Sequence, residues 1–503
     1  MGHAARLARA LWALAREGVF LAIDPAAAPP AARVPLALTR ALARKRAGLS
    51  GLAPAMTRLG PSYVKLGQFL ATRQDVVGAK VAAELEKLQD RVPPFPREVA
   101  ARRVEDSLGR PLGELYESFG EPVAAASVAQ VHRARVRDAD GVRDVAVKVL
   151  RPGVERRFRR DLDDMRFAAR FAEAWFPAAR RLRPVETVET LARSVRREMD
   201  LRLEAAAASE FRENAEKDAE FRVPSVDWER TSRDALTLEW IDGAAMSDDA
   251  ALDAAGHDRP RLARLVIQSF LRHALRDGLF HADMHRGNLF VDPQGRLAAV
   301  DFGIMDRIGD KERRFLAEIL YGFIVRDYRR VAEVHFEAGY VPRTHSVEDF
   351  AQAIRAVGEP IHARTADQIS MARVLTLLFE ITSLFDMSTR TELVLLQKTM
   401  VVVEGVARGL DPKLDMWATA EPVVRDYIEG HLGPSGIARR ALGDLGKAAA
   451  LLSRAPGIVE RLFDGIENPP PAQPPARTFA VWRWIAVAVL VYAAYRYGLA
   501  HPG

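Results

Sequence analysis

Cysteine is absent from this chain of 503 residues. The absence excludes disulfide bridges, thiolate zinc sites, iron–sulfur clusters and cysteine nucleophiles. A large excess of charge is also missing, because 73 Lys and Arg residues face 67 Asp and Glu residues and the two signs are interleaved along the chain. We therefore expect no nucleic-acid partner.

A convincing secretory signal is missing as well. The first apolar stretch is broken by Arg16 and Glu17, and no clean cleavage site of small residues follows. Leucines and arginines recur on opposite sides of a helical pattern, Leu7, Leu11 and Leu14 against Arg6, Arg9 and Arg16. Two interpretations of residues 1–33 stay open: a basic amphipathic helix on an anionic membrane, or a helix packed on the main domain.

The last part of the chain carries its membrane signal. Residues Phe479 to Gly498 form a stretch of 20 residues that is apolar and aromatic apart from Arg483 and Arg496, which can snorkel. It corresponds to about 30 Å of helix, enough to match a bilayer core. Tryptophans mark one end and tyrosines the other, as in an aromatic belt. We predict a transmembrane helix at 478–499, tethered by a Pro-rich linker at 456–477. A docked or interfacial helix is the alternative.

Hydrophobic periodicity between these ends predicts an α+β fold. Residues 34–117 follow helical periods, and residues 118–240 change to a period of two with short strands. Residues 241–455 return to helical periods, interrupted by a strand–turn–strand pattern at 289–301. A small β-rich lobe followed by a larger helical lobe is the element order of a protein-kinase-like bilobal fold.

The strongest chemical signal surrounds that strand–turn–strand pattern. The segment from His281 to Asn288 places Asp283 five residues before Asn288, and Asp301 opens an Asp-Phe-Gly triplet after the second strand. Protein kinases use this spacing for a catalytic base and for two Mg²⁺ ligands. The pattern predicts a site for ATP and Mg²⁺ in which Asp283 accepts a proton and Asn288 and Asp301 hold the metal.

A lysine upstream completes the predicted site. Lys148 and Ala146 share one face of a strand, so a small residue can lie against an adenine while the ammonium reaches the phosphates. Lys148 needs a carboxylate to orient it. Glu198, Asp200 and Glu204 all lie on the helix predicted after the strand, around 186–215, and Glu204 is the expected partner.

Two further segments are expected to contact the nucleotide. Where kinases have a Gly-rich loop, this chain has an alanine-rich one with a different backbone freedom, comprising Ala124, Ala125, Ala126, Ser127 and Val128. Such a loop should cover the nucleotide differently and suppress transfer to a second substrate, although a packing strand is the alternative. The junction between lobes offers backbone at Glu239 and Ile241 to the adenine edge.

Together these motifs resemble the UbiB (AarF) family of atypical protein-kinase-like proteins, over roughly residues 50–415. The most specific match is the KxGQ signature from Lys65 to Gln68, on a helix that follows Gly60 and Pro61. The alanine-rich loop and the pair Glu198 and Asp200 match further signatures. Arg286, where members close to UbiB usually have proline, differs from the pattern, and so does the single C-terminal span.

The resemblance implies that the KxGQ helices cover the active site. Lys65 and Gln68 would then face the nucleotide pocket, with Lys65 near Glu198 and Asp200. It also implies ATP or ADP binding, slow ATP hydrolysis and little or no protein phosphorylation, in support of ubiquinone or related isoprenoid-lipid biosynthesis. The implied partners are a membrane lipid or quinone precursor and ubiquinone-biosynthesis proteins.

Three functions stay open on the sequence: an ATPase that acts on a membrane lipid, a phosphotransferase for a small molecule or lipid, and a nucleotide-dependent scaffold. All three fit a bacterial inner membrane with the lobes in the cytoplasm, where ATP is found.

Overall fold

The computed structural model describes residues 3–22, 30–43, 48–71, 77–88, 93–139, 141–175, 180, 183–362, 381, 384–387 and 391–432. Residues 433–503 lie outside this set, and with them the predicted linker at 456–477 and the predicted transmembrane helix at 478–499. Among the described helices, none combines the length and apolar character that a membrane crossing requires.

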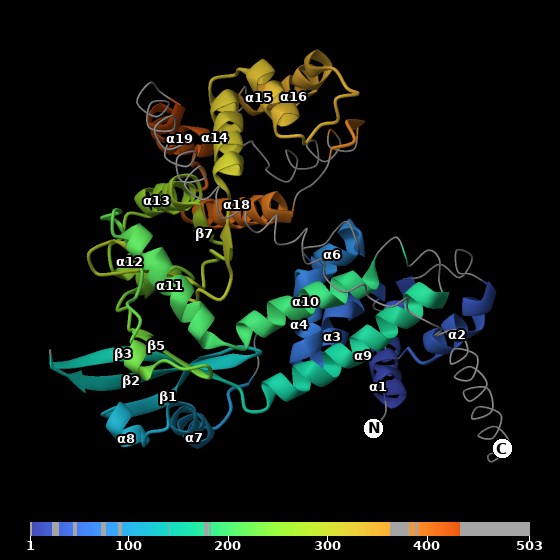
Figure 1. Cartoon of the computed structure of the whole chain (residues 1–503), viewed down its shortest axis with the longest axis vertical. Coiled ribbons are helices and arrows are strands. Elements are labelled where there is room, and N and C mark those ends of the chain that lie inside the picture. The colour runs from blue at the N-terminus through green and yellow to red at the C-terminus, as the bar shows by residue number, and fades with distance from the viewer. Residues whose placement is uncertain are drawn as a thin grey trace, which may run out of the picture. The chain divides into compact units, whose positions relative to one another are not determined.

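A four-stranded antiparallel sheet forms the small lobe (Figure 1). Its strands are β1 (Ser118–Ala125), β2 (Ala129–Asp138), β3 (Gly141–Leu150) and β5 (Ala235–Glu239), in the order β1-β2-β3-β5. The register pairs Val131 with Lys148, and Lys148 with Leu236 on the other side. The lysine strand is therefore central, with hydrogen-bonded neighbours on both edges.

The two faces of this sheet carry different side chains because successive residues of a strand point to opposite sides. Val145, Val147 and Val149 are fully buried and pack against α7 (Arg97–Leu108) and α8 (Leu112–Leu115). Residues of the opposite face pack against α11 (Leu201–Ala215), whose Leu201 and Ala205 share a core with Leu150 and Leu236. Lys148, which alternates with the valines, lies on the α11 side.

The KxGQ signature lies in a group of short helices ahead of the sheet. Their bounds are α2 (Pro30–Ala41), α3 (Leu52–Leu59), α4 (Pro61–Ala71) and α6 (Ala79–Leu85), with 3-10 turns at Val19–Ala22 and Gly48–Gly51. Gly60 separates α3 from α4 with φ of 105°, a region that strongly favours glycine. Gly67 permits a close helix contact, since a Cβ there would lie 2.2 Å from Leu88 and 2.9 Å from the sulfur of Met56.

The first helix, α1 (His3–Arg16), packs on the rest of this unit. Ala10 and Ala13 are buried against Leu59. The Arg6 guanidinium bonds both oxygens of Asp164 on α9 (Val154–Trp175), at 2.5 and 2.6 Å. Of the two interpretations of residues 1–33, the packed helix is the one that these contacts match.

The helical block between β3 and β5 divides into more helices than expected. Helix α9 lies beside α10 (Pro184–Glu198) along a shared apolar core (Figure 1). The expectation that three carboxylates lie on a single helix is wrong, because α10 ends at Glu198 and α11 starts at Leu201. Asp200 stands between them in an extended conformation and caps α11 by accepting a hydrogen bond from the Arg202 N–H.

Residues after β5 form the helical part of the fold. Its helices are α12 (Asp249–Ala254), α13 (Arg259–Arg272), α14 (Asp310–Ile324), α15 (Tyr328–Glu337), α16 (Val347–His362), α18 (Thr391–Leu410) and α19 (Met416–Leu432). Its short strands are β6 (Ala244–Ala245), β7 (Leu279–His281), β8 (Leu289–Val291), β9 (Leu297–Ala299) and β10 (Met305–Arg307). Strand β4 (Phe221–Arg222), which precedes β5 in the sequence, joins them by pairing with β9. Strands β8 and β9 form the predicted strand–turn–strand, and β7 pairs with β10. These two pairings flank the segments that carry Asp283 and Asp301.

Candidate functional site

The centre of the site is Lys148, which lies between two carboxylates. Its Nζ is 2.7 Å from Oε1 of Glu204 on α11 and 2.9 Å from Oδ1 of Asp301, two residues after β9. Glu204 lies 56 positions after Lys148 in the sequence, and Asp301 lies 153 positions after it. The structure thus brings together the lysine, the expected partner Glu204 and the acidic residue of the Asp-Phe-Gly triplet.

Burial and charge perturb this cluster in opposite directions. Burial, reinforced by the charge of Asp301, raises the pKa of Glu204 to about 7, although Lys148 opposes the shift. Partial desolvation disfavours the charged form of Asp301, although its side chain is 51% exposed, and the Lys148 ammonium outweighs this and holds the pKa of Asp301 below its usual range. The pKa of Lys148 is raised despite burial, because Asp301 and Glu204 both favour the ammonium. One cation faces two acids, and Glu204 is the acid whose protonation is favoured.

Asp301 occupies a backbone conformation that few residues adopt. Its φ is 62°, in the left-handed region, where Asp is tolerated better than most side chains. Phe302 anchors the turn, since its ring is 1% exposed and packs near Phe211 and His281. The Asp301 carboxylate accepts a hydrogen bond from the Gly303 N–H at 3.3 Å. A strained residue held by a buried neighbour is typical of functional sites.

The segment from His281 to Asn288 is tied together by its own side chains. The Asp283 N–H donates to Nδ1 of His281 at 3.1 Å. Nδ1 must then be the acceptor, so the imidazole proton lies on Nε2, which is 3.3 Å from the carbonyl oxygen of Val300. Burial lowers the pKa of His281 and keeps the ring neutral. His281 thereby joins the Asp283 segment to the strand that leads to Asp301.

Asn288 is held against the same loop. Its Nδ2 donates to the carbonyl oxygen of Asp283 at 3.1 Å, so Oδ1 is the atom that it can offer to a cation. The Asp283 carboxylate is 43% exposed, with Nε2 of His285 at 3.7 Å. Across the described part of the chain, no three His, Asp or Glu side chains converge as a metal cluster.

Contacts outside the motif position this loop. The hydroxyl of Thr399, buried on α18, donates to the carbonyl oxygen of Ala282 at 3.1 Å. Arg286 donates to the carbonyl oxygen of Met246 at 2.7 Å and to Asp249 at 2.5 Å. Neither Thr399 nor the pairing of Arg286 was found from the sequence, because no motif spacing links them to the loop.

The KxGQ helix is joined to the end of α10 by an ion pair. Lys65 on α4 lies 2.8 Å from Glu198 at the end of α10, and both side chains are largely shielded from solvent. Asp200, expected near Lys65 as well, is bonded by the Arg202 guanidinium at 2.7 Å. Gln68 lies almost one turn further along α4 and is half-buried.

The segments expected to touch the nucleotide are partly committed to other contacts. Ala124 and Ala125 belong to β1, so the alanine-rich loop is reduced to a turn at 126–128. Glu239 donates its N–H to Ser225 at 2.9 Å, and its carboxylate is paired with Arg222. Ile241 is buried. If Glu239 meets an adenine edge, it must use its carbonyl oxygen.

Comparison with known proteins agrees with this architecture. Residues 87–335 match the ABC1 atypical kinase-like domain, and residues 354–415 match the UbiB helical domain. A solved structure, described as the complex of Rv3197 with erythromycin from Mycobacterium tuberculosis, matches with a TM-score of 0.50. It is 24% identical and covers 71% of this chain and 90% of that one, which supports the kinase-like α+β fold alone.

Two bacterial relatives share more of the sequence. A protein of Marinobacter nauticus named "Probable protein kinase UbiB" is 40% identical over 417 residues, 82% of this chain and 75% of that protein. One of the same name from Xanthomonas euvesicatoria pv. vesicatoria is 42% identical over 414 residues, 80% of this chain and 74% of that protein. With this identity and the two domain matches, the chain belongs to the UbiB family of ABC1 atypical kinase-like proteins.

Proposed function

We propose that this protein is a membrane-anchored, kinase-like ATPase that supports ubiquinone or related isoprenoid-lipid biosynthesis and transfers little or no phosphate to proteins. The observation that carries the proposal is Lys148, bonded to both Glu204 and Asp301 at 2.7 and 2.9 Å. A lysine and glutamate pair next to an Asp-Phe-Gly acid is the arrangement that orients phosphates and a metal in kinases.

The chemistry of the donor set fits MgATP. Mg²⁺ prefers oxygen ligands and is usually held by one or two side chains together with phosphates and water. Asp301 offers a carboxylate, and Asn288 offers its amide oxygen because its nitrogen is committed to Asp283. Bound MgATP would supply an electrophilic γ-phosphoryl group whose developing charge the metal neutralises.

The protein residues then have separate roles. Lys148 binds phosphate oxygens, and Glu204 orients its ammonium. Asp283 accepts the proton of the attacking water, and the neutral His281 holds the Asp283 backbone through the 3.1 Å hydrogen bond. Asn288 and Asp301 hold the metal. The turn at 126–128 and Ala146 cover the nucleotide on the β side.

The KxGQ segment supports hydrolysis over protein phosphorylation. The pair of Lys65 and Glu198 at 2.8 Å fastens α4 to the end of α10, directly before the helix that carries Glu204. The family resemblance implies that the KxGQ helices lie on the side of the site where a kinase admits its peptide substrate. A helix fastened there favours water or a small acceptor as the second substrate.

The remaining parts of the proposal concern location. Membership of the UbiB family supports a role in ubiquinone biosynthesis. The apolar residues of 478–499 would anchor the chain, with the lobes in the cytoplasm, where ATP is present. The predicted domain limits at 34–117, 118–240 and 241–455 belong to the same proposal.

The decisive experiment compares Asp301→Asn with Asp349→Asn, an exposed acid on α16, in the full-length protein. Mg-dependent ATP hydrolysis should be lost in the first variant and kept in the second. A deletion strain should recover its quinones with wild type and with Asp349→Asn only. Unchanged hydrolysis by Asp301→Asn would refute the assignment.

Two outcomes would point to other functions. Labelled phosphate that appears on a lipid after incubation with membrane extract would identify a phosphotransferase. Full complementation by a Lys148→Met variant that binds no ATP would favour a scaffold over an ATPase.

A further inference from the structure

A short Pro-rich segment follows the KxGQ helices in the sequence and is bonded through Arg151 to the turn at 126–128. Residues 93–95, which we name the strap, follow Leu88 after only four positions, and Leu88 packs on Gly67 of the KxGQ signature. Three of the four residues at 93–96 are proline, so Phe95 carries the sole backbone N–H among them. Such a segment is stiff, and its position depends on the few groups that bond it.

Gln130 on β2 uses its whole amide to hold the strap. Its Oε1 accepts the Phe95 N–H at 2.9 Å, and its Nε2 donates to the Phe95 carbonyl oxygen at 3.1 Å. A single side chain therefore gives Phe95 both hydrogen bonds that a neighbouring strand would give. The Gln130 side chain is buried, so breaking either bond leaves polar groups without water.

His132 fixes the orientation of that amide. Its Nδ1 lies 2.9 Å from the carbonyl oxygen of Gly120, which can only accept, so Nδ1 carries the proton. Nε2 of the same ring, kept neutral by burial, accepts the second Nε2 hydrogen of Gln130 at 2.8 Å. The amide cannot flip without losing all three bonds.

Arg151 joins the strap directly to the alanine-rich turn. It follows β3, three residues after Lys148. Its Nε donates to the carbonyl oxygen of Ala126 at 2.8 Å, one terminal nitrogen donates to that of Pro93 at 2.9 Å, and its guanidinium lies 5.4 Å from the centre of the Phe95 ring. Its backbone N–H also donates to Val128 at 2.8 Å.

We propose that the strap couples the KxGQ helices to the turn at 126–128, and that Gln130 and Arg151 are the positioning residues that hold it. This inference rests on the proposed nucleotide site. The turn contains no glycine, so its backbone has little conformational freedom and its position is set by these neighbours. Displacement of the KxGQ helices is then transmitted through residues 93–95 to the backbone at 126–128, which covers the phosphates in the proposed site.

The test uses full-length Gln130→Met, Arg151→Gln and Arg151→Lys, with Arg137→Gln as control. Arg137 is exposed at the opposite end of β2 and pairs with Glu117. Hydrogen exchange without nucleotide should speed up about tenfold at Phe95 in Gln130→Met and at residues 126–128 in Arg151→Gln. Unchanged exchange in both variants overturns the strap, whether or not nucleotide binds.

Binding separates this inference from the proposed function. MgADP affinity should fall about three- to tenfold in Arg151→Gln, recover in part in Arg151→Lys and stay constant in Arg137→Gln. The loss should be non-additive with Lys65→Ala, which releases the KxGQ helix. Additive losses, or faster exchange with unchanged affinity, overturn the coupling. Absence of MgADP binding by wild type instead refutes the proposed function, and exchange still decides the strap.

Discussion

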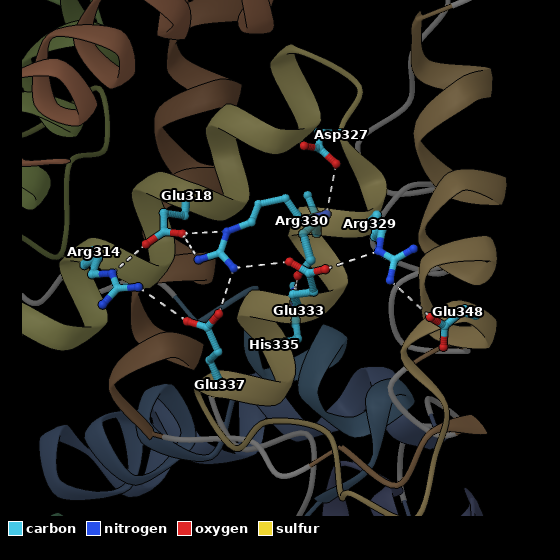
Figure 2. Close-up of polar contacts among 10 residues, drawn as sticks. Arg314, Glu318, Asp327, Arg329, Arg330, Glu333, His335, Glu337 and Glu348 are labelled. Atoms are coloured by element: carbon cyan, nitrogen blue, oxygen red, sulfur yellow. Dashed lines mark hydrogen bonds and ion pairs between the residues drawn. The ribbon is translucent and has the colours of Figure 1, made fainter. Parts of the chain in front are cut away.

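The site cluster of Lys148, Glu204 and Asp301 and the α14–α15 cluster of the helical part are both ion-pair networks, and they are assembled differently. The α14–α15 cluster consists of Arg314, Glu318, Arg329, Arg330, Glu333 and Glu337, together with Glu348 at the start of α16 (Figure 2). Its bonded partners are at most 23 positions apart in the sequence. The partners of Lys148 are 56 and 153 positions away.

The clusters also differ in how charge is satisfied. Arg330 bonds Glu318, Glu333 and Glu337, and Arg314 bonds Glu318 at 2.5 Å as well (Figure 2). A guanidinium has five donors, so several carboxylates can share it in fixed geometry. In the site cluster one ammonium serves two acids, and Glu204 is pushed toward protonation. The α14–α15 cluster has enough arginine donors for its carboxylates, and such a local network stabilises packed helices. The site cluster has one ammonium for two carboxylates, and it is therefore suited to bind another cation.

Lys148→Met is expected to have the largest effect on the site cluster. We expect MgADP affinity to fall by at least about 100-fold, because the variant removes the phosphate-binding ammonium and leaves two acids facing each other. Isothermal titration calorimetry measures the loss. Arg330→Met, which removes the central cation of the other cluster, is the matched control and should bind normally. Affinity of Lys148→Met within threefold of wild type would contradict the role of the lysine.

The free energy of unfolding should depend on the α14–α15 cluster, although nucleotide affinity does not. Arg330→Met leaves the buried Glu318 with only Arg314 and should lower the free energy of unfolding by about 2 kcal/mol. Urea denaturation followed by circular dichroism checks this value. An undisturbed midpoint would show that the α14–α15 cluster contributes nothing to folding.

A smaller effect concerns the pH dependence of stability. Because the folded-state pKa of Glu204 is raised from 4.5 to about 7, the folded protein takes up this proton more readily than the unfolded chain. The stability from this group is complete below pH 4.5 and declines as pH rises toward 7, by about 1–3 kcal/mol. The unfolding free energy of wild type minus that of Glu204→Gln should therefore decrease between pH 4.5 and 7.5.

Asp301 does not obscure that measurement. Its folded-state pKa lies below its usual range, so the stability it contributes is present above the unfolded value of 3.8 and is lost only at more acidic pH. A difference between wild type and Glu204→Gln that stays flat from pH 4.5 to 7.5 would mean that Glu204 is not perturbed.

The smallest effect is expected at the rim of the α14–α15 cluster. The Arg329 side chain is 71% exposed, and its bonds to Glu333 and Glu348 are 3.2 and 3.4 Å long. Arg329→Gln should change the free energy of unfolding by less than about 0.5 kcal/mol, because exposed ion pairs contribute little. Thermal melts at low and high salt test this, and a loss like that of Arg330→Met would show that the rim and the centre act as one unit.

Much of the site architecture could be predicted because kinase-like chemistry constrains spacing. Strands β8 and β9 lie where the interval between Asn288 and Asp301 predicted them. Lys148 lies on the face opposite Val147 and Val149, as alternation requires. The choice of Glu204 as its partner also agrees with the structure, since a carboxylate one turn inside α11 can reach the sheet.

Other features depended on contacts that periodicity does not encode. The end of α10 at Glu198 was not predicted, because the helical pattern of the sequence continues through it. Asp200 caps α11 because its backbone is extended, which the sequence pattern does not indicate. Thr399 and Arg151 belong to no motif. Each acts by donating to a backbone carbonyl, and any residue of the chain can supply a carbonyl.

The amino-acid sequence alone determined the kinase-like order of elements, the identity of the charged site residues and the family, because those depend on residue type and local spacing. The tertiary structure decided which of the acids Glu198, Asp200 and Glu204 pairs with which cation. It also decided that the alanine-rich turn is bonded, through Arg151, to residues 93–95. Ion pairs and hydrogen bonds are strong only between groups a few ångströms apart. The partners of each charged residue therefore depend on the path of the chain, which brings residues distant in the sequence together.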